Sequence, residues 1–165
     1  MNGSEYMYTV AEVSVGLSGF AAIVMVMRRR EGSSLSSLDR LMVATIIERG
    51  LMAAFLSLLP VLLFGLGLSE PLLWAVSSGT IVIYGIWIAY RGIRNRRYII
   101  DTMMSMSLYF GLIGIGVAVI IVQLMHALGV GMQQSAWWYM IGVTWLLVTA
   151  GYRFFFILRE WIHGQ

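Results

Sequence analysis

The sequence predicts an all-α, polytopic integral membrane protein with five transmembrane helices. Hydrophobic residues make up 59% of its 165 residues and charged residues 12%, whereas a soluble domain carries about a quarter charged residues. Its mean hydropathy is +0.83. The apolar residues form continuous runs and not the in/out alternation of a membrane β-barrel. We therefore expect residues 1–165 to form one transmembrane domain.

Five apolar stretches approach the roughly 20 residues that cross a ~30 Å hydrocarbon core as a helix. The predicted spans cover approximately residues 6–27, 50–68, 71–90, 102–125 and 136–158. An interfacial helix over residues 37–49 is expected to lead into the second span, because Leu38, Leu41 and Met42 follow helical spacing. The third span is expected to start at Ser69 and Pro71, a capping residue and a proline near the first helical position.

The distribution of arginine predicts the orientation. All 11 basic residues are arginines. They lie between the first and second spans, between the third and fourth, and at the C-terminal end, and none lies in the other three segments. The positive-inside rule therefore predicts an N-out/C-in protein of a cell inner (plasma) membrane. Arginines beside spans also favour contact with anionic lipid headgroups on the cytoplasmic side over nucleic-acid binding, for which the chain has no separate domain.

The absence of cysteine excludes disulfides, thiolate catalysis and cysteine-ligated metal sites. No carboxylates pair at one depth, and no serine or histidine has a recognisable triad partner in the sequence. We expect no enzymatic activity, no metal and no cofactor.

Glu12, Gln123 and His126 are the candidates for a pore or for a proton or cation site. Glu12 lies roughly 9 Å of helix rise beyond Tyr6, on the predicted side without arginine. It could be protonated, accept hydrogen bonds from Gln123, His126 or Tyr8, or face a hydrated mouth. Packing and a hydrated or proton-linked role both remain open.

A second group of charges is predicted near the cytoplasmic face. Glu48 and Arg49 precede the apolar part of the second span, and Arg153 lies within the fifth. Arginine side chains can reach the interface from such depths. We expect interface anchoring, or an ion pair between Glu48 and Arg153.

Small residues at helical spacing predict close helix packing. In the first span, Glu12, Gly16 and Gly19 mark one face, and Ser14, Ser18 and Ala22 mark the opposite face. Two faces of this kind on one helix favour self-association. The remaining packing candidates are Ser107, Gly111 and Gly114 in the fourth span. Pro60 predicts a kink in the second span, with Ser57 placed to satisfy part of the freed backbone.

The preferred interpretation is a small homo-oligomer that provides a pathway for a small ion or solute, because a chain without a soluble domain acts within or at the membrane. The alternative is a non-conducting scaffold or accessory subunit of a larger membrane complex. An enzyme acting on lipid ranks third.

Overall fold

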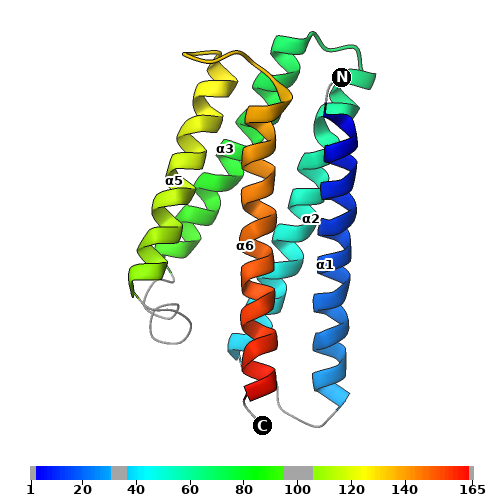
Figure 1. Cartoon of the computed structure of the whole chain (residues 1–165), viewed down its shortest axis with the longest axis vertical. Helices are drawn as coiled ribbons and strands as arrows, with labels where there is room; N and C mark the ends of the chain where they lie inside the picture. Colours follow the sequence, from blue (N-terminus) through cyan, green and yellow to red (C-terminus); the bar gives the residue numbers. More distant parts are fainter. Residues whose placement is uncertain (1–2, 31–36, 95–105, 164–165) are drawn as a thin grey trace. The chain divides into compact units, whose positions relative to one another are not determined.

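The computed structural model describes residues 3–30, 37–94 and 106–163, apart from the side chains of 28–30, 37–39, 106–108 and 160–163. Every long element in these ranges is an α-helix. The helices are α1 (Ser4–Arg30), α2 (Ser37–Gly65), α3 (Glu70–Arg94), α5 (Met106–Leu128) and α6 (Ala136–His163) (Figure 1).

All five described helices are long and apolar enough to cross a membrane, which confirms the predicted class. The membrane-crossing segments are Ser4–Met27, Arg40–Gly65, Glu70–Arg94, Tyr109–Leu128 and Ala136–Arg159. The first, third and fifth begin and end within four residues of the predicted spans. The predicted start of the fourth span, at residue 102, lies outside the described residues.

The second span is part of a longer helix than its apolar run indicates. α2 continues without a break from Ser37 to Gly65, so the predicted interfacial segment and the span form one helix. The helix ends three residues before the predicted boundary at 68, because Gly67 adopts the left-handed conformation, with φ of 78°. The amides of Gly67 and Leu68 then turn back to the carbonyls of Phe64 and Leu63, at 3.0 and 3.3 Å.

α3 begins where its capping sequence predicts. Glu70 is its first residue, and the Leu73 amide donates to the carbonyl of Ser69 at 2.9 Å. Pro71 stands in the first turn, where a missing amide proton costs no helical hydrogen bond.

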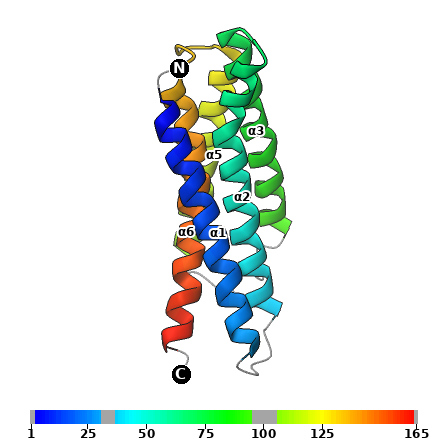
Figure 2. The ribbon, with the colours of Figure 1, turned by 90° about the vertical axis from the view of Figure 1, so that its right-hand side faces the viewer.

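The chain divides into two compact units, each described separately. The first comprises Met1–Val61 and Val143–Gln165 and therefore contains α1 with most of α2 and α6. Figures 1 and 2 show α1 and α2 side by side and running in opposite directions. Buried residues recur at spacings of three and four along both helices. This spacing is typical of α-helices that pack as in a left-handed coiled coil. They include Met7, Ser14, Ser18 and Ala21 on α1, and Ile46, Gly50, Ala53, Ser57 and Pro60 on α2.

The second unit, Leu62–Gly142, contains α3 and α5 together with the end of α2 and the first residues of α6. α3 and α5 form an antiparallel pair (Figure 1). A side chain at Gly85 would meet Ile120, since an added Cβ would lie 2.8 Å from Ile120 Cγ1. Near the C-terminal end of α3, the Tyr109 hydroxyl of α5 donates to the carbonyl of Gly92 at 3.0 Å.

Candidate functional sites

The second unit contains a buried polar cluster centred on His126. This residue lies near the end of α5 and is fully buried. Its Nδ1 lies 2.7 Å from the Ser78 hydroxyl of α3, and its Nε2 lies 2.9 Å from the backbone nitrogen of Ser135, the residue that precedes α6. Because the Ser135 amide can only donate, Nε2 must accept and carries no proton. The neutral ring therefore has its proton on Nδ1 and donates it to Ser78.

The structure brings Ser78 and His126 into contact, and the expectation that no serine or histidine has a triad partner stays a prediction. A base that activates a serine must accept the hydroxyl proton. Here the ring donates through Nδ1, while Nε2 is occupied by Ser135. The arrangement therefore positions the imidazole and does not activate Ser78 as a nucleophile.

Gln123 lies one turn before His126 and is also fully buried. Its side-chain nitrogen donates to the carbonyl of Trp138 in α6 at 2.6 Å. Its Oε1, and the hydroxyl of Ser77 on α3, have no hydrogen-bond partner among the described residues. Gly142 makes this approach of α6 possible, since an added Cβ there would lie 2.9 Å from the Gln123 amide group and 3.0 Å from Ile81 Cδ1.

Aromatic rings border the polar cluster. Trp74 of α3 lies 6.0 Å from His126 and 5.8 Å from Tyr139, measured between ring centroids. Trp74 and Tyr139 are both buried. The cluster is thus a packed interior, with hydroxyl, amide and imidazole groups joining α3, α5 and the start of α6.

Glu12 belongs to the first compact unit, whereas Gln123 and His126 belong to the second. Its side chain is exposed on α1. Gly16 and Gly19 are exposed too, and an added Cβ at either would meet no atom within 4 Å. This face of α1 is therefore not covered by the described residues of the protomer.

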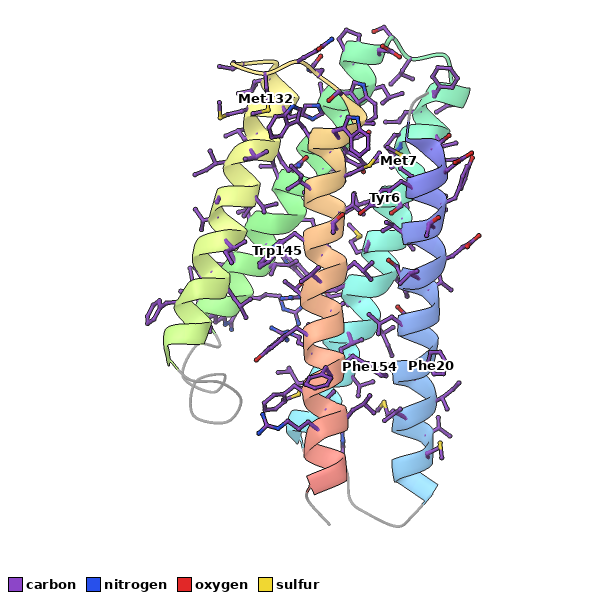
Figure 3. All side chains as sticks on the ribbon, in the orientation of Figure 1. Tyr6, Met7, Phe20, Met132, Trp145 and Phe154 are labelled. Carbon is purple, nitrogen blue, oxygen red and sulfur yellow. The ribbon has the colours of Figure 1, made fainter. Side chains whose placement is uncertain are left out.

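The opposite face of α1 packs inside the protomer. Ser14 and Ser18 are buried, and the Ser18 hydroxyl donates to the Ser14 carbonyl at 2.9 Å. An added Cβ at Gly50 of α2 would lie 2.9 Å from that carbonyl and would overlap the Ser18 hydroxyl. Near the start of α1, the Tyr6 hydroxyl lies 2.7 Å from Thr144 Oγ1, and Figure 3 shows Tyr6 pointing from α1 toward α6.

The predicted charged group is brought together within the first unit. Glu48 and Arg49 of α2 and Arg153 of α6 are half-buried. Arg153 interacts electrostatically with both, attracted by Glu48 and repelled by Arg49. All three lie within membrane-crossing helices of the structure. Their role as interface anchors or as an ion pair stays a prediction.

The packing glycines predicted on α5 are not packed inside the protomer. Gly111 and Gly114 are exposed, with no atom within 4 Å of an added Cβ. The Ser107 side chain lies outside the described part of the chain. Among the helical glycines that the structure describes, Gly50, Gly85 and Gly142 have an atom within about 3 Å of an added Cβ. Their sequence context resembles that of the open glycines, so small-residue spacing did not distinguish them.

Pro60 is buried inside α2. The expectation that Ser57 compensates for the missing amide stays a prediction. The Ser57 hydroxyl donates to the carbonyl of Ala53 at 2.8 Å, whereas the acceptor that Pro60 would have used in a regular helix belongs to Leu56.

No three histidine, aspartate or glutamate side chains gather into a possible metal site within the described ranges. The chain matches no protein-family model, no curated protein and no solved structure.

Proposed function

We propose that this protein is a homo-oligomeric membrane protein that provides a pathway for a small cation. The observation that supports the proposal is the uncovered face of α1, on which Glu12 is exposed beside Gly16 and Gly19. A carboxylate exposed on a membrane-crossing helix is costly when it faces lipid. A second copy of the chain, or water in a pathway between copies, removes that cost.

The two glycines support self-association through this face. Lipid provides no hydrophobic drive for helix association, so transmembrane helices associate by close packing at small residues. The space in front of Gly16 and Gly19 is open within the protomer. Copies that meet there would bring several Glu12 carboxylates to one depth, and rings of acids favour cations at pore mouths.

The proposal includes the N-out/C-in orientation in a cell inner membrane. The distribution of the arginines supports this orientation. Every arginine lies in a segment predicted to be cytoplasmic or near the cytoplasmic end of a predicted span. At the end of α3, the Arg91 guanidinium lies 4.5 Å from the centre of the Trp87 ring. An arginine over an exposed tryptophan suits the headgroup region, where anionic lipids would be its partners.

A non-conducting scaffold or accessory subunit is the second candidate. The same uncovered face of α1 could pack against a helix of a different protein, with Glu12 bonded to a polar side chain there. We assign no reaction to the chain under either candidate.

Cation flux into liposomes distinguishes the candidates. The purified full-length chain is reconstituted, and flux is compared with that of Glu12→Gln, which keeps the side-chain volume and hydrogen-bonding capacity. We expect the variant to keep its oligomer size while cation flux falls roughly tenfold, the lower end of what focused charge contributes to ion entry.

Glu70→Gln is the matched control, because Glu70 is also exposed in a membrane-crossing helix but lies in the first turn of α3. We expect it to leave flux unchanged. Flux from neither form would support the scaffold candidate. Flux that is unchanged in Glu12→Gln would reject the role of Glu12, and loss of assembly in that variant would make Glu12 a structural residue.

A further inference from the structure

The connection between α5 and α6 is attached to the end of α5 by side-chain hydrogen bonds. Gln134 donates to the carbonyls of His126 and Ala127, at 3.2 and 3.5 Å. The Ser135 amide donates to His126 Nε2 at 2.9 Å. This connection carries Met132, labelled in Figure 3. Of these bonds, only the one to Nε2 depends on the protonation state of a side chain.

A proton on Nε2 would convert the acceptor of that bond into a donor. An imidazolium donates from both ring nitrogens, so two N–H groups would face each other where Ser135 now approaches His126. The bond from Nδ1 to Ser78 would survive, because Nδ1 already donates. Protonation therefore acts selectively on the attachment of the connection and spares the attachment of α5 to α3.

Among the residues that the structure describes, those that contact His126 carry no charge that would compensate an imidazolium in place. α3 contributes Trp74 and Ser78 to its contacts, and the connection contributes Gln134 and Ser135. From α6, Tyr139 reaches Trp74, and a tyrosine phenol is uncharged below about pH 10.

Carboxylates are equally scarce around the ring. Among the described residues of this unit the carboxylate is Glu70, which is exposed one turn before Trp74. A protonated ring would gain by exchanging the Ser135 amide for water.

We infer that His126 is a proton-binding site that controls the α5–α6 connection: the neutral ring holds Ser135 at the start of α6, and protonation frees Ser135 from the end of α5 and so loosens residues 129–135. The glycines of this segment favour such a movement. Gly129 and Gly131 have φ of 65° and 72°, conformations that glycine adopts and leaves without the steric cost other residues meet. The inference does not depend on conduction, because it concerns a hydrogen bond inside one protomer.

The protonation state is measured by nitrogen NMR of the imidazole in the full chain, embedded in lipid nanodiscs. His163→Gln makes His126 the sole histidine of the sample, since the chain contains two. We expect a neutral ring with its proton on Nδ1 at about pH 8, and conversion to the imidazolium on acidification toward about pH 5.

Movement of the connection is measured in the same background by spin labelling. The natural chain has no cysteine, so Gln133→Cys places one label on an exposed residue of the connection. Ile83→Cys, at an exposed position of α3, provides the matched control. We expect the mobility of the label at position 133 to rise with the same midpoint as ring protonation, and the mobility of the label at position 83 to stay unchanged.

His126→Gln tests the mechanism, because its side-chain carbonyl can accept from the Ser135 amide at every pH. We expect low label mobility at position 133 across the whole range. A ring that carries its proton on Nε2 near neutral pH, a ring that does not protonate above about pH 5, or protonation without a change in label mobility would each overturn the inference. So would a pH response that persists in His126→Gln. The NMR and mobility measurements on His126 itself decide the matter if that variant does not fold.

Discussion

At Gly50, the close packing of α1 against α2 depends on the absence of a side chain. Gly50 lies on α2 where the Ser14 carbonyl and the Ser18 hydroxyl of α1 come closest. The backbone atom cannot move away without shifting the helix. An added methyl group therefore has no low-cost accommodation.

We predict that Gly50→Ala lowers the free energy of unfolding by about 1–3 kcal/mol, the usual cost of overpacking. Gly79→Ala is the matched control, because a Cβ at Gly79 in α3 meets no atom within 4 Å. It should be neutral or stabilise by up to about 1 kcal/mol, through the higher helix propensity of alanine. Unfolding in mixed detergent micelles, followed by circular dichroism, gives both values. Equal stability of the two variants would contradict the close contact at Gly50.

Polar residues in the spans were easier to select from the sequence than packing glycines. Gln123 and His126 stand out because a buried amide or imidazole in an apolar helix requires partners. No comparable feature of the sequence distinguishes closely packed glycines from open ones among the 18 of the chain. Gly50 and Gly16 both lie in apolar helical sequence, and only the neighbouring helix makes one crowded and leaves the other open.

At the scale of the element, the two faces of α1 differ in how they are packed. Its Ser14 and Ser18 face is buried against α2, and its Glu12, Gly16 and Gly19 face is open. The sequence predicted that both faces would either contact protein or line a cavity. Within the protomer one is packed, and the packing of the other stays a prediction.

We predict that Gly16→Leu or Gly19→Leu shifts the detergent-solubilised protein toward smaller species without unfolding the protomer. The leucine side chain would fill the space that a second helix backbone needs. Within the protomer it would not clash at its Cβ, because no neighbouring atom lies within 4 Å of a Cβ added at either glycine. Native mass spectrometry measures the distribution of species. Val117→Leu, at an exposed position of α5, is the control for adding a leucine elsewhere.

A monomer in the unmodified protein would remove the support for self-association through α1. Unfolding of the Gly16 or Gly19 variant would instead show that the face is occupied within the protomer. A shift in Val117→Leu as large as that in the α1 variants would remove the distinction between the two surfaces.

At the scale of the whole molecule, the arginine distribution predicts where each connection lies. We predict that reporter fusions after Arg30, Arg97 and Gln165 give cytoplasmic signals, and that a fusion after Gln134 gives an external one. The physical reason is that arginine-rich short loops are retained on the cytoplasmic side during insertion. Enzymatic reporters that are active on only one side of the membrane make the measurement. An internal signal at Gln134 would contradict the orientation.

The helical class and the presence of five membrane-crossing segments could be predicted from the sequence. Both follow from composition and from the length of apolar runs, because an apolar helix satisfies its own backbone in lipid whatever its neighbours are. The start of α3 directly after Ser69 also belongs to this level. Tertiary structure alone decided that Ser78 and Ser135 hold His126, that Gly50, Gly85 and Gly142 admit close neighbours, and that Glu12 is uncovered. These features join residues far apart in the chain, and they depend on how helix faces meet, which one helix does not encode alone.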